Sequence, residues 1–340
     1  MKKAILSLEL LAAATLVGCA RGNQDALNSA GIQAQRIEHL WWVIFWTTLV
    51  VFVCVIGFLG KSVVRTHDVQ LLREKPEPEA PEADKGLKVA VITAVTVTVI
   101  ALFSLLTIAI STGKAMASLQ SKNPVTIEVT GHQWWWEVRY PDSISSNIVV
   151  TANEIHIPVG TPVVLNSTSQ DVIHSFWAPN IQGKRDLIPG HTTAIWFQAD
   201  REGVFRGQCA EFCGHQHAHM AFLLIAEAPE KFQAWMRHQR ESSVPPASDE
   251  AKRGLQVFLS GPCVMCHTIR GTDAGSKNGP DLTHIAGRGT LAAATIPNTP
   301  GYLAGWIADS QHIKPGNHMP QNTLPSQDQQ ALVTYLETLQ

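Results

Sequence analysis

The sequence predicts a multidomain chain with a two-helix transmembrane hairpin, an antiparallel β-sandwich and an all-α domain. Two uncharged apolar runs, at 40–59 and 89–110, indicate the membrane helices. Short β-type runs broken by Gly, Pro and Asn occupy 125–226. Helical patterns return only after a polar, proline-containing linker. We therefore expect a membrane anchor followed by two globular domains.

A targeting segment precedes the first apolar run. It begins with two lysines, residues 5–16 are mostly apolar, and Leu-Val-Gly-Cys ends at Cys19. This ending is similar to the processing box of bacterial lipoproteins, which predicts that residues 1–18 are a removed signal peptide and that Cys19 carries lipid. The alternative is an ordinary uncleaved signal with an incidental cysteine, and Glu9 within the apolar run counts against efficient export.

The region 19–115 is predicted to hold the N-terminal segment and the membrane hairpin, with helices at about 40–60 and 89–110. Each run can cross the roughly 30 Å hydrocarbon layer. The connection carries more basic residues than the outer flanks, with Lys61, Arg65, Arg73, Lys75, Lys85 and Lys88 against Arg21, Arg36, Lys114 and Lys122. The positive-inside rule then places the connection in the cytoplasm and everything after residue 110 outside.

The charge balance and the cysteines limit the possible functions. The formal net charge of -2 provides no basic field that could replace the counterions of a nucleic acid, so we expect no nucleic-acid partner. Six cysteines are few for a disulfide scaffold. Four of them form two tight pairs, which indicate metal or haem binding: Cys209 with Cys213 and Cys263 with Cys266.

Residues 122–228 are predicted to form the sandwich, and 229–248 a helix and a linker. The β-type runs lie at 125–129, 148–150, 161–165, 193–197 and 221–225, and strands at this spacing with turn residues between them are typical of sandwiches.

Residues 249–340 are predicted to form the all-α domain. Ser248 is expected to cap its first helix, and Ser326 with Gln329 has the pattern of a capping box that opens its last helix. The last helix carries apolar side chains on one face, so it can pack: Leu332, Tyr335, Leu336 and Leu339.

Soft ligands concentrate at 209–220, where one strand ends and the next begins: Cys209, Cys213, His217 and Met220. Sulfur with imidazole selects copper or zinc, and Met220 favours copper because structural zinc takes four Cys or His ligands. His174, from another strand edge, supplies the second imidazole that two thiolate-bridged copper ions require. A zinc site or a disulfide is the alternative. Two neighbouring imidazoles are predicted to be exposed or locally hydrogen-bonded rather than ligands: His215 and His219.

The segment 263–267, Cys-Val-Met-Cys-His, has the pattern of c-type haem attachment. Cys263 and Cys266 would bond the haem covalently, and His267 would take the proximal iron position. Met319 is the predicted sixth ligand, because a Met/His pair suits electron transfer. His318 competes for that position, whereas Met265 between the two cysteines cannot turn to the distal side.

The cluster at 209–220 resembles the dinuclear copper centre, CuA, of cytochrome c oxidase subunit II. The resemblance covers most of the chain and includes the aromatic segment 131–136, Gly-His-Gln-Trp-Trp-Trp, and the strand at 153–160. It implies a cupredoxin-like fold for the sandwich. With the haem motif, it implies a fused class I cytochrome c domain, as in caa-type oxidases.

Carried over by position, the resemblance implies that Cys209 and Cys213 bridge both copper ions. His174 and Met220 would complete one ion, and His217 with the Glu211 carbonyl the other. It also implies three further roles: the Glu211 carboxylate ligates magnesium at the border with subunit I, the Pro280 carbonyl orients His267, and Trp134 is the exposed tryptophan at which cytochrome c hands over its electron. For Trp134 the alternative is a core or membrane-interface aromatic.

The function implied is electron transfer from cytochrome c, or from an upstream cytochrome c reductase, through haem c and CuA to subunit I. Oxygen reduction and proton translocation would take place there, so this chain has no catalytic residue of its own. Expected partners are subunits I and III and membrane lipid, in the bacterial inner (plasma) membrane with both globular domains on the periplasmic side. The alternatives are a CuA-type nitric oxide reductase subunit and a stand-alone membrane electron carrier.

Two positions depart from the family pattern. The tryptophan that accompanies an acidic residue near the second span is absent, so neither Glu82 nor Asp84 is assigned to proton uptake. His191 stands where an arginine is common.

Overall fold

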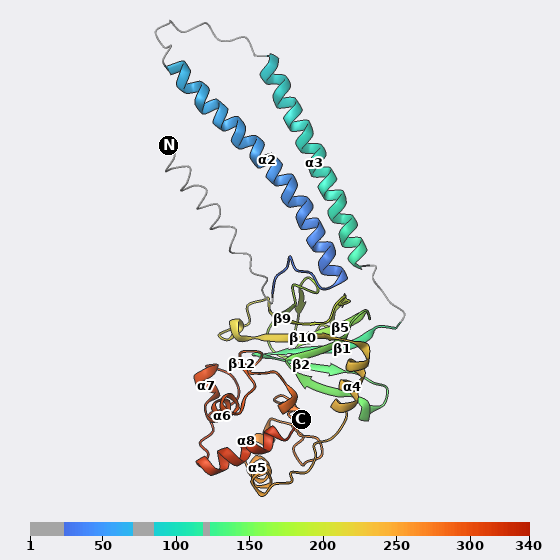
Figure 1. Ribbon diagram of the computed structural model, residues 1–340, viewed down its shortest axis with the longest axis vertical. Helices are drawn as coiled ribbons and strands as arrows, with labels where there is room; N and C mark the ends of the chain where they lie inside the picture. Colours follow the sequence, from blue (N-terminus) through green and yellow to red (C-terminus); the bar gives the residue numbers. More distant parts are fainter. Residues whose placement is uncertain (1–23, 71–84, 118–122) are drawn as a thin grey trace. The chain divides into compact units, whose positions relative to one another are not determined.

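A computed structural model describes residues 24–70, 85–117 and 123–340 (Figure 1). Several predictions fall outside these residues: the signal segment 1–18, the lipid attachment at Cys19, and the two acidic residues before the second span. The membrane helices form one compact unit and the globular part another.

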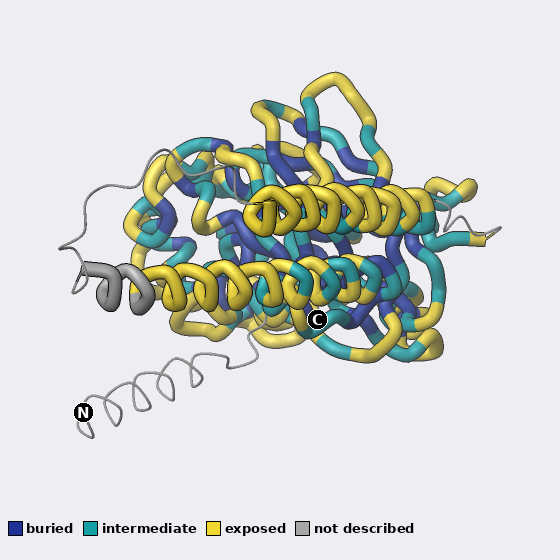
Figure 2. The backbone as a smooth tube through the Cα atoms, turned by 90° about the horizontal axis from the view of Figure 1, so that it is seen from above, coloured by how far each residue is buried: buried dark blue, intermediate teal, exposed yellow. Residues whose placement is uncertain are grey.

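Helices α2 (Ile32–Gln70) and α3 (Lys85–Ala117) confirm the two predicted spans and extend beyond the apolar runs at both ends. Their apolar side chains are exposed along most of each helix (Figure 2). Hydroxyl groups within the spans bond to the carbonyl four residues earlier, as Thr96 and Thr107 do, so they need no water in a lipid environment. Aromatic side chains cluster near the start of α2, as is typical of a membrane interface: Trp41, Trp42, Phe45 and Trp46.

The sandwich, residues 123–228, consists of two five-stranded sheets. One has the order β3-β2-β1-β5-β8: β3 (Val149–Ala152), β2 (Trp135–Tyr140), β1 (Val125–His132), β5 (Val163–Ser169) and β8 (Thr193–Phe197). The other has the order β4-β10-β9-β6-β7: β4 (Glu154–Pro158), β10 (Ala221–Glu227), β9 (Gly203–Cys209), β6 (His174–Trp177) and β7 (Arg185–Leu187).

The predicted sandwich is confirmed, but two of its strand pairings are parallel rather than antiparallel. β1 pairs with β5 and β4 with β10 in parallel. The chain passes from β3 in one sheet to β4 in the other and back to β5. Strands that become neighbours in this way are not joined by a hairpin, which would have forced them to be antiparallel.

The core between the sheets follows the alternation of side chains along the strands. Ile127 and Val129 on β1 point inward, as does Trp136 on β2, and all three are buried. Trp136 contacts the rings of Phe176 and Phe222 edge-on. These aromatic residues lie beneath the end of the sandwich that carries the predicted ligands, so the ligand strands β6 and β9 rest on a packed core.

The segment before the first span belongs to the sandwich, although the sequence placed it with the membrane anchor. Ala30 donates to the carbonyl of Asn180 at 2.6 Å, and Ile32 donates to that of Gln198 at 3.2 Å. Gly31 is required here because a Cβ at this position would lie 2.5 Å from the carbonyl oxygen of Ile181. Periodicity misses this contact because the segment is short and irregular.

Helix α4 (Pro229–Gln239) packs on the sandwich and leads through the linker to the C-terminal domain, residues 249–340. The helices and short strands of the C-terminal domain are α5 (Asp249–Ser260), η3 (Pro262–Met265), η4 (Ile285–Gly287), β11 (Thr290–Leu291), β12 (Ile296–Pro297), α6 (Pro300–Ala308), α7 (Ser310–Ile313) and α8 (Ser326–Glu337). Apart from the small β11–β12 hairpin, the domain is helical.

The two predicted helix starts have opposite outcomes. The Ser248 hydroxyl accepts from the N–H of Ala251 and caps α5, as expected. The capping box at α8 is wrong, because Pro325 is the cap and Ser326 already lies in the helix. Gln329 instead donates to the carbonyl of Ala304 at 3.0 Å and joins α8 to α6. The predicted apolar face of α8 is buried.

Gly254 permits the close crossing of α5 and α8. A Cβ at this position would lie 2.0 Å from the carbonyl oxygen of Ala331 and 2.6 Å from Cβ of Tyr335. Gly254→Ala should therefore destabilise the C-terminal domain by about 3 kcal/mol, as overpacked cores do. Gly305→Ala, on the exposed face of α6 with open space around it, should be neutral or slightly stabilising. Denaturant unfolding of the full chain measures the stability of both variants. Equal changes in the free energy of unfolding would contradict the close contact of α5 with α8 at Gly254.

Candidate metal and haem centres

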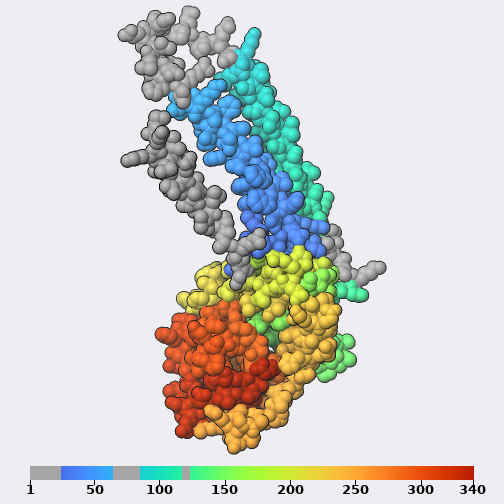
Figure 3. All heavy atoms as spheres, in the orientation of Figure 1, coloured from blue at the N-terminus to red at the C-terminus, as the bar shows by residue number. Residues whose placement is uncertain are grey.

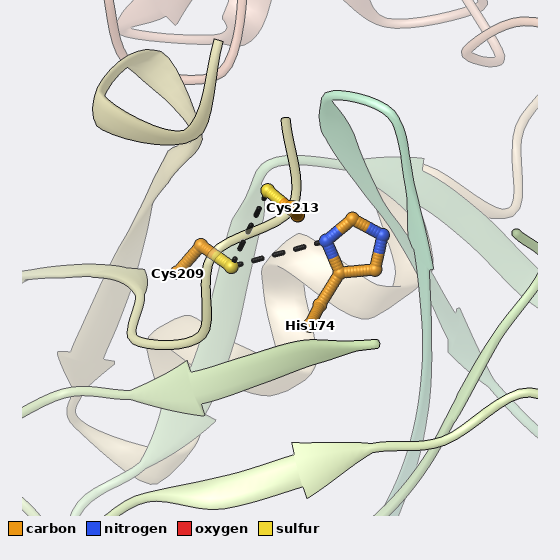
Figure 4. Close-up of side chains that lie close together, drawn as sticks. All are labelled: His174, Cys209 and Cys213. Carbon is orange, nitrogen blue, oxygen red and sulfur yellow. Dashed lines mark hydrogen bonds between the residues drawn. The ribbon is translucent and has the colours of Figure 1, made fainter. Parts of the chain in front are cut away.

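Three buried side chains from separate positions converge at one end of the sandwich (Figure 4). His174 begins β6, Cys209 ends β9, and Cys213 lies in the following loop. The Cys209 Sγ atom lies 3.8 Å from the Cys213 Sγ atom and 3.8 Å from His174 Nδ1. Antiparallel pairing of Phe176 with Cys209 holds the two strands in this register.

The remaining predicted copper ligands surround the same pair of sulfur atoms. His217 Nδ1 lies 3.6 Å from the Cys213 Sγ atom, and Met220 Sδ lies 3.7 Å from it. The backbone carbonyl of Glu211 lies 3.1 Å from Cys209 Sγ. The structure thus brings all six predicted positions together. The two other imidazoles of this loop are exposed, as predicted: His215 and His219.

This donor set fits a pair of copper ions better than a single zinc ion. Two sulfurs, two imidazole nitrogens, a thioether and a carbonyl exceed the four ligands of a closed tetrahedral zinc site. The two thiols are close enough to share one proton, which lowers the pKa of Cys209 and raises the pKa of Cys213. Without metal, the site therefore favours a thiolate at Cys209 and a thiol at Cys213. Two bound cations would compensate the negative charge that a second thiolate at Cys213 adds.

Asp171, which the sequence did not single out, orients His174. Its Oδ1 atom lies 2.8 Å from His174 Nε2, which leaves Nδ1 directed at Cys209. Its carboxylate also accepts from the N–H groups of Gln133 and Val172. Burial opposes ionisation of Asp171, but these hydrogen bonds outweigh it and lower the pKa of the carboxyl. The only signal in the sequence was an acidic residue three positions before His174.

Asp171→Asn should weaken copper binding by about 10- to 100-fold, the usual effect of losing a ligand's hydrogen-bond partner. An amide can still accept from His174 Nε2, but its NH₂ group cannot accept from the Gln133 N–H. Competition with a chelator measures the affinity. Asp186→Asn, on the exposed β7 strand, is the control. Equal affinities in both variants would show that Asp171 does not support the site.

The haem-attachment segment forms a tight turn at the end of α5. His267 N–H and Cys266 N–H both donate to the Cys263 carbonyl, at 2.9 and 3.1 Å. His267 Nδ1 lies 2.7 Å from the Pro280 carbonyl oxygen, so the predicted contact is present and Nε2 is left for iron. Gly279 makes this approach possible, because a Cβ there would lie 2.9 Å from His267 Cε1. The two thiols are free, as attachment of a haem requires.

The segment that carries Met319 is held by hydrogen bonds rather than by regular structure. The Met319 carbonyl accepts from Ser310 Oγ at 2.6 Å and from Gln311 Nε2 at 2.7 Å, and its N–H donates to Asn317 Oδ1 at 2.8 Å. His318 is exposed, which favours Met319 as the axial ligand. Among the described residues, the half-buried Arg288 has a buried Nε atom without a hydrogen-bond partner, although its guanidinium also donates to the Asp281 carbonyl; a free donor here suits an acidic group such as a haem propionate.

Trp134 is buried rather than exposed, which contradicts the sequence expectation. Only 7% of it is accessible, because the C-terminal domain covers it. Its indole N–H donates to the Cys213 carbonyl at 2.9 Å, and its own carbonyl accepts from Lys314 Nζ at 2.6 Å. The sequence could not show this because the covering residues lie about 180 positions away. The neighbouring Trp135 stacks on His132 at 4.3 Å.

The β-sandwich carries a cluster of soft donor atoms and is fused to a helical domain with a Cys-x-x-Cys-His turn. Two apolar helices anchor the chain. Together these features define a membrane-bound electron-transfer protein. Residues 143–227 match the family of the cytochrome c oxidase subunit II periplasmic domain, and residues 251–340 match cytochrome c. The chain is 33% identical to cytochrome c oxidase subunit 2 of Alkalihalophilus pseudofirmus over 95% of its own length and 93% of that protein. The chain belongs to the cytochrome c oxidase subunit II family.

Two further proteins are similar to parts of this chain. Cytochrome c oxidase subunit 2 of Bacillus sp. PS3 is 30% identical over 65% of this chain and 64% of that protein. The crystal structure of the periplasmic domain of subunit II from Bradyrhizobium japonicum is 32% identical, with a TM-score of 0.33, over 35% of this chain and 96% of that one.

Proposed function

We propose that this chain takes electrons from cytochrome c and passes them through haem c and then CuA to subunit I of a proton-translocating cytochrome c oxidase, where oxygen is reduced. Bound haem c and the copper pair would each supply a one-electron carrier. The observation that carries the proposal is the contact between the two domains at Trp134. Lys314, five residues before Met319, bonds to the Trp134 carbonyl, and the Trp134 indole bonds to the carbonyl of Cys213.

This contact supports a specific order of transfer. Trp134 lies inside the chain, so a soluble cytochrome c cannot touch it while the C-terminal domain is in place. We propose that the external donor, cytochrome c or a cytochrome c reductase, docks on the C-terminal domain, and that Trp134 relays electrons within the chain.

The loop between the two copper-site cysteines supplies the proposed contact with subunit I. Glu211 is exposed, and Phe212 beside it is 76% exposed although its neighbours Cys209 and Cys213 are buried. An apolar ring and a carboxylate presented together suit a protein partner and a shared magnesium ion. We propose that subunit I covers this loop, that subunit III completes the complex, and that Cys19 is lipidated. The copper and C-terminal domains would lie on the periplasmic side of the bacterial plasma membrane.

The whole complex, purified from membranes, tests the proposal. It should consume oxygen with reduced cytochrome c, contain covalently bound haem, and show the electron paramagnetic resonance of one electron shared by two copper nuclei. A complex with the signal of a single copper nucleus, or one without oxygen consumption, would contradict it.

The relay through Trp134 has its own test. Trp134→Leu should slow electron transfer from haem to copper in a rapid-mixing experiment, without changing the haem or copper content. Trp135→Leu, which alters the next tryptophan away from the covered contact, is the matched control. Equal transfer rates in the two variants would remove Trp134 from the path.

A further inference from the structure

The loop between β11 and β12 of the C-terminal domain has an unfavourable backbone. Ala292, Ala293 and Ala294 all have positive φ, at 54, 59 and 55°. A left-handed conformation costs about 1–2 kcal/mol per residue with a Cβ. Consecutive strained residues persist only where the surroundings hold them, and such strain is found at functional sites. We call residues 292–295 the alanine loop.

Each carbonyl of the three alanines has a hydrogen-bond donor, and two of these donors belong to the sandwich. Ala293 O accepts from the N–H of Ala221 at 3.1 Å, and Ala294 O accepts from Arg206 NH1 at 2.9 Å. Ala292 O accepts from Thr295 Oγ1 at 2.6 Å and from Lys314 Nζ at 3.2 Å. The turn thus directs the carbonyls of Ala293 and Ala294 at the sandwich and that of Ala292 at Lys314. Figures 1 and 3 show the C-terminal domain against the sandwich.

The alanine loop contacts the peptide groups on both sides of the proposed copper ligand Met220. Ala221 N–H, directly after Met220, donates to Ala293 O. The His219 carbonyl oxygen, directly before it, lies 3.3 Å from Thr295 Oγ1, whose proton is donated to Ala292 O at 2.6 Å. β4 does not reach this end of β10, since their pairing begins at Leu223, so the alanine loop takes the open edge position.

Two further bonds connect the C-terminal domain to the loop between β9 and β10, which carries most of the proposed copper ligands. Gln216 Nε2 donates to the Pro315 carbonyl at 2.7 Å. Lys314 reaches the loop through Trp134, whose indole bonds to Cys213. Lys314 is 2% exposed, and no carboxylate partner is found for it among the described residues, so the two carbonyls are its main compensation for leaving water.

We propose that the alanine loop, together with Lys314, is a brace by which the C-terminal domain fixes the position of Met220 relative to Cys213 in the copper site. The inference rests on the proposed copper function, and it adds that the second domain shapes the site as well as supplying electrons. Position matters at this ligand, because a thioether bonds copper weakly and tunes its potential. Loosening the brace would let the Met220 segment fluctuate.

Two variants from opposite domains test the brace without altering a metal ligand. Lys314→Ala removes the ammonium that donates to Ala292 O and to the Trp134 carbonyl, although Thr295 Oγ1 still donates to Ala292 O. Arg206→Ala removes the donor to Ala294 O. Lys231→Ala, whose ammonium pairs with Glu202 at the surface of the sandwich, is the matched control. Hydrogen exchange in the full chain, metal-free and copper-loaded, gives the ratio of the exchange rate of the Ala221 amide to that of the β1 amides.

We expect this ratio to rise at least about tenfold in both variants and to stay unchanged in the control. In the copper-loaded protein, the copper hyperfine splitting should also change in both variants. If the Ala221-to-β1 exchange ratio stays at the wild-type value in both variants, the brace is overturned. This also holds if a variant unfolds generally, because unfolding accelerates the exchange of both sets of amides equally and leaves their ratio unchanged. Failure of the wild-type chain to bind copper would instead contradict the proposed function, and the exchange ratio would still decide the brace.

Discussion

Cys209→Ser should abolish the two-copper centre and reduce electron transfer from the C-terminal domain to subunit I by at least about 100-fold, a larger loss than removal of a ligand's hydrogen-bond partner produces. Cys209 Sγ is the atom that joins the site: it lies 3.8 Å from both Cys213 Sγ and His174 Nδ1 and 3.1 Å from the Glu211 carbonyl. A hydroxyl there is a harder ligand that cannot share an electron between two copper ions as a thiolate does.

Copper analysis and electron paramagnetic resonance of the purified complex measure this result. Cys54→Ser, in the exposed face of α2, makes the same chemical change away from the site and should leave both unchanged. The haem should still be attached and reducible by cytochrome c, since its ligands lie in the other domain. Retention of two coppers in the Cys209 variant would show that the sulfur cluster is not the copper site.

The sequence predicted the elements that depend on local pattern. The two spans are apolar over lengths that suit a membrane-crossing helix, and the strands alternate inward and outward side chains. The proposed copper ligands were also visible in the chain, because Cys209, Cys213, His217 and Met220 lie within one strand-to-strand loop. His174 was grouped with them only by chemistry, and the β6–β9 pairing sets the two strand ends side by side.

Features that depend on contacts between distant segments could not be predicted. Trp134 was expected to be exposed, and its burial follows from Lys314 and the C-terminal domain, which no local pattern connects to it. The alanine loop has an ordinary sequence, and only its surroundings impose positive φ. Asp171 was missed because a single acidic residue near a histidine is common, and only the 2.8 Å distance identifies its role.

Met319→Leu should lower the potential of the haem by roughly 0.2 V, about a quarter of the range of about 0.8 V that axial ligation spans. A thioether stabilises ferrous over ferric iron, so its loss makes the haem harder to reduce. Because about 59 mV corresponds to a tenfold change for one electron, the equilibrium with external cytochrome c should move by roughly three powers of ten. Cytochrome c oxidation by the complex should fall accordingly, although the copper centre remains loaded.

His318→Leu is the matched control, since it removes the competing ligand from the adjacent position. It should leave the potential unchanged, because His318 is exposed whereas the backbone of Met319 is fixed by Ser310 and Gln311. Redox titration of the haem absorbance in the whole complex measures both variants. A large drop in the His318 variant with none in the Met319 variant would reverse the ligand assignment. In that case the hydrogen bonds around Met319 would serve to position Lys314 against Trp134.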